Sequence, residues 1–165
     1  MQALGGAKNH MVVLPDADLD LAADAAVNSG FGSAGERCMA VSAAVAVGAA
    51  ADPIVEAVAG KAAAVTVGNG RHPGVEMGPV ITRAAKDRIV GLIGTGAEQG
   101  ASLAVDGRST VVADHEAGFF VGPTVLDRVT PDMDVYREEV FGPVLSVVRV
   151  AVSYTHLTLP TILRV

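Results

Sequence analysis

Cys38 is the only cysteine of this chain, and it follows a glycine-rich bend. The bend and the residues after it read Phe31-Gly-Ser-Ala-Gly-Glu-Arg-Cys-Met-Ala-Val-Ser42. Glycine lets a backbone turn tightly and leaves room for a ligand to approach. Arg37 stands beside the thiol, and a nearby cation favours the thiolate, which is the nucleophilic form. The pattern therefore predicts a thiol that attacks an electrophilic carbon.

A lone cysteine can also be a small buried apolar residue, so neighbouring motifs must separate the two interpretations. The segment around Cys38 closely resembles the catalytic-cysteine signature of the aldehyde dehydrogenase superfamily. That signature is an aromatic residue, three residues, Gly, Gln or Glu, any residue, and Cys. Other segments resemble further motifs of the superfamily in the same order along the chain, namely residues 4–20, 77–81, 118–125 and 135–144. Together they favour the catalytic interpretation.

Within the superfamily, Gly-Ala-Lys-Asn-His10 and Glu36-Arg-Cys-Met-Ala look most like the CoA-acylating branch that acts on malonate and methylmalonate semialdehyde. The resemblance implies an α/β catalytic domain with a largely parallel sheet flanked by helices, of which residues 1–150 form an incomplete part. The superfamily's NAD-binding domain and an oxyanion-hole asparagine have no counterpart in these residues, so we expect this chain alone to be inactive. Residues 151–165 resemble translated vector sequence, and we expect them to be a sequence artefact.

The resemblance also implies roles for individual residues. Cys38 would be the catalytic nucleophile, Glu139 would hold the hydroxyls of the nicotinamide ribose of NAD, and Phe141 would pack beside that ribose. Arg37 would pair with the carboxylate of the semialdehyde substrate, because a guanidinium fork matches a carboxylate. Each has a plainer alternative: Glu139 as a surface charge, Phe141 as a core residue and Arg37 as a structural contact.

One position departs from the hydrolytic members of the superfamily. Leu4 aligns with their general-base glutamate, and the first carboxylate of this chain is Asp16. Without a base, water is a poor nucleophile, whereas the thiol of CoA needs less activation. CoA is therefore the predicted acyl acceptor, and the resemblance implies acetyl-CoA or propionyl-CoA as the product. The alternatives are an alignment slip or a substitute base, hence a hydrolytic enzyme that releases a free acid, or an inactive remnant.

Alternating strand and helix patterns must position these residues. Strands are predicted at residues 10–14, 41–47, 119–126 and 144–150, with a short one before the turn at Asp106-Gly107. A helix is expected at residues 18–29, capped by Asp16. A second opens at Asp52-Pro53, and Thr82 caps a third. This alternation indicates an α/β layer with largely parallel strands.

Composition narrows the functional classes. Half of the 165 residues are apolar, which excludes a disordered chain, and the net charge is −6 with no cluster of Lys or Arg, which argues against nucleic acid. A single cysteine excludes an internal disulfide and fits a reducing compartment, so we expect a cytoplasmic protein. The longest uncharged apolar stretch, residues 38–51, is shorter than the roughly 18 residues that span a bilayer. The four histidines are scattered, so no metal site is expected; the intact parent is expected to be a homo-oligomer by resemblance.

Overall fold

Five short strands and four helices follow from the alternating apolar patterns, and the computed structural model describes them over residues 5–151. The strands are β1 (Asn9–Val13), β2 (Val41–Val47), β3 (Ser102–Val105), β4 (Thr124–Asp127) and β5 (Val144–Val150). The helices are α1 (Leu19–Phe31), α2 (Ala51–Ala64), α3 (Arg83–Glu98) and α4 (Asp134–Arg137), and 3₁₀ turns lie at Gly32–Gly35 and Gly48–Ala50. The expectations for Leu4 and for most of the tail, residues 152–165, fall outside the described residues.

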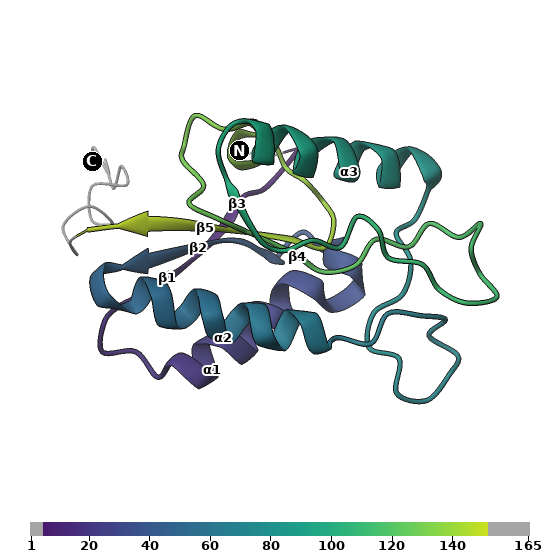
Figure 1. The fold of residues 1–165 in the computed structure, drawn as a ribbon, viewed down its shortest axis with the longest axis horizontal. Coiled ribbons are helices and arrows are strands. Elements are labelled where there is room, and N and C mark those ends of the chain that lie inside the picture. Colours follow the sequence, from purple (N-terminus) through teal and green to yellow (C-terminus); the bar gives the residue numbers. More distant parts are fainter. Residues whose placement is uncertain (1–4, 152–165) are drawn as a thin grey trace.

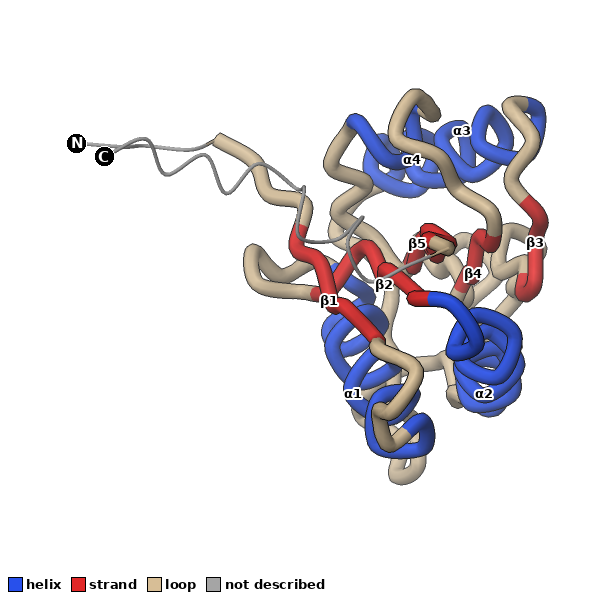
Figure 2. The backbone as a smooth tube through the Cα atoms, turned by 90° about the vertical axis from the view of Figure 1, so that its left-hand side faces the viewer, coloured by secondary structure: helices blue, strands red, loops and turns tan. Residues whose placement is uncertain are grey.

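The sheet has the strand order β1-β2-β5-β4-β3. β1, β2, β5 and β4 pair in parallel, and only the edge strand β3 runs antiparallel to its neighbour. α1 and α2 cover one face of the sheet, and α3 and α4 lie over the other (Figures 1 and 2). The predicted α/β fold with a largely parallel sheet is confirmed.

β2 and β5 occupy the centre of this sandwich because their side chains are apolar on both faces. The sequences VSAAVAV and VLSVVRV lack the polar alternation of a half-exposed strand, as expected where helices cover both sides. Ile54 and Val58 of α2 seal one face, and Ile89 and Ile93 of α3 seal the other; each is at most 1% exposed. Both strands have the predicted bounds.

Two helix starts differ from prediction. α1 is capped by Asp18, whose carboxylate accepts a hydrogen bond from the Leu21 N–H at 3.1 Å, and not by Asp16, which lies in the preceding turn. A cap must reach an N–H two or three residues ahead, and Asp16 is too early to do so. α2 begins at Ala51 after a 3₁₀ turn, so Pro53 is its third residue; the N–H that proline lacks would have had no helical partner there.

β4 is shorter than the predicted strand at residues 119–126. The Gly122 N–H donates to the Gly107 carbonyl at 2.9 Å, and Pro123 has no N–H to give to a neighbouring strand. The ladder therefore starts only at Thr124. Thr82 caps α3 as predicted, its hydroxyl accepting from the Ala85 N–H at 3.0 Å, whereas the short α4 had no sequence signal.

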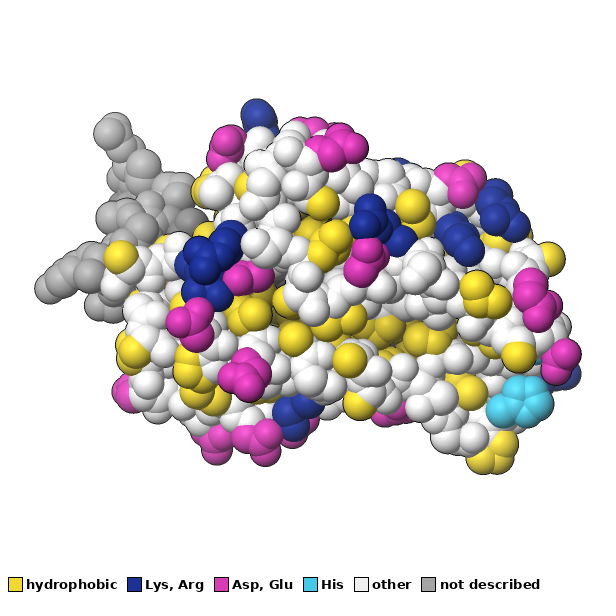
Figure 3. Space-filling model, in the orientation of Figure 1, with side chains coloured by type: hydrophobic (Ala, Val, Ile, Leu, Met, Phe, Trp, Pro, Cys, Tyr) yellow, Lys and Arg dark blue, Asp and Glu magenta, His cyan; other side chains and the backbone are white. Residues whose placement is uncertain are grey.

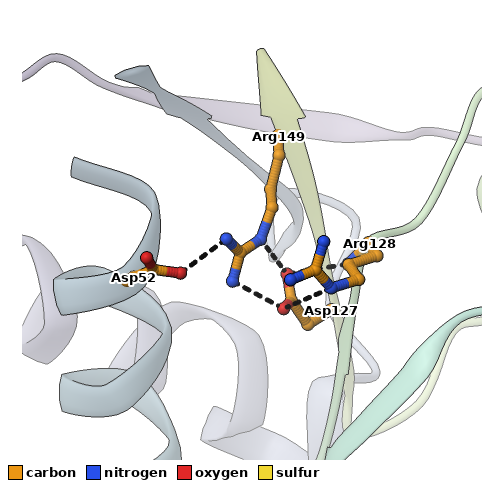
Figure 4. Close-up of polar contacts among 4 residues, drawn as sticks. All are labelled: Asp52, Asp127, Arg128 and Arg149. Atoms are coloured by element: carbon orange, nitrogen blue, oxygen red, sulfur yellow. Dashed lines mark hydrogen bonds and ion pairs between the residues drawn. The ribbon is translucent and has the colours of Figure 1, made fainter. Parts of the chain in front are cut away.

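A charge cluster ties the sheet to α2 toward the carboxyl ends of the strands (Figure 4). Arg149 of β5 donates two hydrogen bonds to the buried Asp127 of β4, each at 2.8 Å, and a third to the exposed Asp52 of α2 at 2.6 Å. The hydrogen bonds to Asp127 and Asp52 raise the pKa of Arg149. The Nε atom of Arg128 lies 4.0 Å from Oδ2 of Asp127. The cluster leaves the opposite edge of the sheet free for the functional site.

The described residues show neither a membrane-spanning helix nor a metal-binding cluster. No helix within residues 5–151 is both long and apolar enough to cross a membrane. Across the same residues, no group of three or more His, Cys, Asp or Glu side chains is arranged to hold a metal ion. Basic and acidic side chains are interspersed on the face in Figure 3, and apolar atoms run in a band at the height of the sheet.

Candidate active site

The site forms at the amino ends of the parallel strands. Because β1, β2 and β5 run in the same direction, the segments that precede them meet at one edge of the sheet. These segments are residues 5–8, residues 32–40 with the cysteine, and residues 138–143 with Glu139 and Phe141. Motifs that lie far apart in the sequence thus become neighbours.

The cysteine loop makes the predicted tight bend, but its left-handed residues include two that are not glycine. Ser33, Ala34 and Gly35 have φ values of 54°, 55° and 69°. A Cβ at Gly35 would overlap the carbonyl of Gly142, so only glycine allows the cysteine loop to approach residues 138–143 this closely. The bend therefore both turns the chain and joins two walls of the site.

Asn9 holds the cysteine loop from the neighbouring strand. Its side-chain amide donates to the Cys38 carbonyl at 2.9 Å and to the Ala40 carbonyl at 3.0 Å. The Cys38 side chain is exposed, which does not fit the alternative of a buried apolar residue. A rigid backbone with an accessible thiol is the arrangement that a nucleophile requires.

Three of the predicted residues share one open pocket. Cys38, Glu139 and Phe141 line a cavity of about 510 Å³, together with the small residues Gly5, Gly6 and Ala7. Phe141 is 40% exposed, so it is not a core residue, and its φ of 46° is unusual for a side chain of this size. Glu139 is half-buried, and a Cβ at Gly6 would stand 3.1 Å from its carboxylate. The pocket therefore brings together a thiol, a carboxyl group and an aromatic ring.

Arg37 lies apart from that pocket. Its guanidinium donates to the carbonyls of Asn28 and Ser29 in the last turn of α1, at 2.9 and 3.0 Å. A cation at the carboxyl end of a helix also offsets the helix dipole. Arg37 lines a separate cavity of about 350 Å³ with Met39. These contacts fit the structural alternative, and pairing with the substrate carboxylate stays a prediction.

Lys8 is the charged group beneath Glu139. Its ammonium donates to the Val135 carbonyl at 2.9 Å. Burial lowers the pKa of Lys8 from 10.5 to about 8, although the nearby Glu139 and Glu138 oppose that shift. At neutral pH Lys8 is therefore still mostly cationic and stabilises the anionic wall of the pocket.

Arg88 supports the loop that carries Glu139, and the sequence did not predict this role. It projects from α3 and donates to the carbonyls of Glu139 and Val140, at 3.1 and 2.6 Å. The spacing of apolar residues predicted the helix but not the role of Arg88. Every residue has a backbone carbonyl, so an arginine that binds carbonyls has no characteristic partner residue in the sequence. The only available signal was a basic residue one position before the buried Ile89.

Comparison with known proteins gives a consistent result. A model of the aldehyde dehydrogenase family matches residues 1–156. A malonate-semialdehyde dehydrogenase of Pseudomonas aeruginosa is 53% identical over 151 residues, which are 91% of this chain and 30% of that protein. Malonate-semialdehyde dehydrogenase 1 of Geobacillus thermodenitrificans is 51% identical over 151 residues, covering 92% of this chain and 31% of that protein. The chain thus spans about 30% of the length of these relatives.

Solved structures agree. The crystal structure of a methylmalonate-semialdehyde dehydrogenase from Oceanimonas doudoroffii matches with a TM-score of 0.90 and 50% identity, over 93% of this chain and 32% of that one. A putative methylmalonate-semialdehyde dehydrogenase from Sinorhizobium meliloti 1021, complexed with NAD, matches with a TM-score of 0.88 and 51% identity, over 92% of this chain and 31% of that one.

Proposed function

Because this chain belongs to the aldehyde dehydrogenase family, we propose that it is part of the catalytic domain of an NAD-dependent, CoA-acylating semialdehyde dehydrogenase. The intact enzyme would oxidise malonate or methylmalonate semialdehyde and release acetyl-CoA or propionyl-CoA. The observation that carries the proposal is the single pocket that brings together Cys38, Glu139 and Phe141. The names of the relatives support the substrate class.

Cys38 would perform the covalent step. Its thiolate attacks the aldehyde carbon and forms a thiohemiacetal. When bound, NAD⁺ supplies the acceptor for the hydride that leaves this carbon. Cys38 is then left as a thioester. The substrate carboxylate would depart as CO₂ and a proton from solvent would take its place on the α-carbon. The thiol of CoA would then displace the Cys38 thiolate and take the acyl group. The Asn9 amide, bonded to the Cys38 carbonyl, keeps the sulfur in place through both transfers.

The pocket fits the nicotinamide ribose in size and chemistry. A volume of about 510 Å³ lies within the usual range for small-molecule sites. An ionised Glu139 can only accept hydrogen bonds, which matches two ribose hydroxyls, and the exposed ring of Phe141 offers an apolar face beside them. We assign Glu139 and Phe141 to the cofactor on this basis.

CoA is proposed as the acyl acceptor because the described residues that line the pocket offer no carboxylate left to act as a base for water. Leu4 lies outside the described residues, so its alignment remains a sequence argument. Of the described residues that line the pocket, only Glu139 carries a carboxylate, and that group is assigned to the ribose. Hydrolysis to a free acid is the alternative, and an experiment must distinguish it from acyl transfer to CoA. The homo-oligomeric state of the parent stays a prediction.

The test uses a full-length enzyme that carries these residues. Without CoA, it should release a burst of NADH equal to the number of sites and then turn over slowly, because the thioester accumulates. Adding CoA should raise the steady rate and give a thioester product. Cys38→Ser should abolish the burst while NAD still binds, because a hydroxyl is a much weaker nucleophile than a thiol. If turnover is equally fast with and without CoA and the product is a free acid, the enzyme is hydrolytic and the CoA-acylating assignment is wrong.

A further inference from the structure

We propose that Arg88 of α3 is a positioning residue for the loop that carries Glu139 and Phe141, and through that loop for cofactor binding. The proposal rests on the function proposed above. Arg88 does not line the pocket, and its hydrogen bonds to the pocket loop go to backbone carbonyls.

The contact is a two-pronged grip on consecutive carbonyls. Nη1 of Arg88 donates to the Glu139 carbonyl at 3.1 Å, and Nη2 donates to the Val140 carbonyl at 2.6 Å. A planar guanidinium presents its donors in a fixed fork, so two such bonds fix the orientation of the peptide as well as its position. The Glu139 side chain points from a backbone that Arg88 holds.

The gripped loop is one that would not keep its shape unaided. Phe141 has a φ of 46°, a region that residues with a bulky side chain rarely occupy. Such a conformation persists when the surroundings hold it, and it is typical of functional sites. A Cβ at Gly142 would overlap the side chain of Ile89, which shows that α3 also packs directly against the loop after Phe141. Arg88 and Ile89 therefore secure the loop on both sides of the strained residue.

α3 is a firm base for this grip. Its first turn is capped by Thr82, and Ile89 and Ile93 are fully buried against the sheet. Figure 2 shows α3 on the face of the sheet opposite α1 and α2. Besides its contact with Gly142, the Cys38 loop has an anchor of its own in Asn9 of β1. Loosening Arg88 should consequently move the cofactor wall while leaving the nucleophile in place.

The experiment compares two arginines of the same helix in the full-length enzyme. Arg83 is the matched control: it donates to the Ala117 carbonyl at 3.2 Å and stacks on Phe119, away from the pocket. Arg88→Ala should raise the KM and Kd for NAD about tenfold, the equivalent of one or two lost hydrogen bonds. The KM for the aldehyde and the rate of Cys38 alkylation should not change. Arg88→Lys, whose donors all sit on one nitrogen and do not form a fork, should bind NAD with an affinity between those of the wild type and Arg88→Ala.

Arg83→Ala should leave NAD binding unchanged. Unfolding temperatures of all variants show whether an effect is local. The assignment is wrong if Arg88→Ala binds NAD like the wild type, or if Arg83→Ala weakens NAD binding equally. A wild-type enzyme that binds no NAD would instead overturn the proposed function, and this assignment with it.

Discussion

The thiol, the carboxylate and the aromatic ring of the pocket were all recognisable at the level of single residues, because each belongs to a short motif whose spacing is visible in the sequence. Cys38, Glu139 and Phe141 do meet in one cavity. Arg88 was not recognisable from the sequence, because it acts on backbone carbonyls. For Arg37 the sequence left two interpretations open, and its hydrogen bonds to the end of α1 fit the structural one. A side chain that binds backbone carbonyls does not require a particular type of partner residue, so no sequence motif reveals it.

Lys8 gives a prediction about pH. Its pKa in the folded protein is about 8, below the ordinary 10.5, so between these values the unfolded chain binds more protons than the native one. Stability therefore rises with pH across that window, because deprotonation removes the cost of the buried charge. Relative to Lys8→Met, the wild type should gain unfolding free energy from pH 8 to pH 10.5, measured by urea titration. A difference that is flat or falls over this range would show that Lys8 is not desolvated.

At the scale of elements, the strands that were predicted correctly are those with the least ambiguous sequences. β2 is an unbroken run of small and β-branched residues, and valine makes up most of β5, so both sequences favour a strand. β4 was predicted too long because the apolar residues before Thr124 look like strand residues. Their backbone bonds to other loops instead, and pairing of that kind depends on residues distant in the sequence.

Gly35 tests the bend that carries the cysteine. Gly35→Ala should destabilise the fold by at least about 1–2 kcal/mol, because alanine must adopt a positive φ and its Cβ meets the Gly142 carbonyl. The control is Gly60→Ala in the middle of α2, where a Cβ meets nothing within 4 Å. That change should stabilise by about 0.5–1 kcal/mol. Chemical denaturation of both variants decides, and a neutral Gly35→Ala would contradict the proposed junction of the two loops.

The charge cluster at the other end of the sheet gives a second element-level prediction. Arg149→Met leaves the carboxylate of Asp127, 8% exposed, without its main partner, and should cost about 3 kcal/mol of stability. Asp52→Ala removes an exposed partner and should cost less than about 1 kcal/mol. Alkylation of Cys38 should proceed at the same rate in both folded variants, because the cluster and the thiol lie at opposite edges of the sheet. Equal losses of stability would mean that Asp127 is not the buried anchor.

Considered as a whole, the molecule leaves several large apolar side chains exposed to solvent. Leu21, Met39, Ile81 and Val111 are between 67% and 83% exposed, and Phe141 at the pocket is 40% exposed. Where exposed apolar side chains adjoin one another, they are typical of surfaces that meet another domain or chain. The relatives are about three times as long, since this chain covers 30% of the first of them.

The 165-residue chain alone should therefore self-associate and show no NAD-dependent aldehyde oxidation. Light scattering coupled to size-exclusion chromatography measures the first, and NADH absorbance with an aldehyde substrate measures the second. A monodisperse monomer that reduces NAD⁺ would contradict both expectations.

The parallel pairing of β2 with β5 also sets the order in which the site can come into being. The strand that follows Cys38 finds its central partner only after α2, α3, β3 and β4 have been made. Closing such a large loop is slow, and folding rates fall as contacts become less local. A nascent chain that has emerged only as far as α3 already displays the thiol, yet the wall with Glu139 and Phe141 does not exist. The thiol is therefore synthesised early, and the pocket that we propose for the cofactor is completed late, so we expect Cys38 of the nascent chain to be accessible to oxidants and electrophiles during that interval.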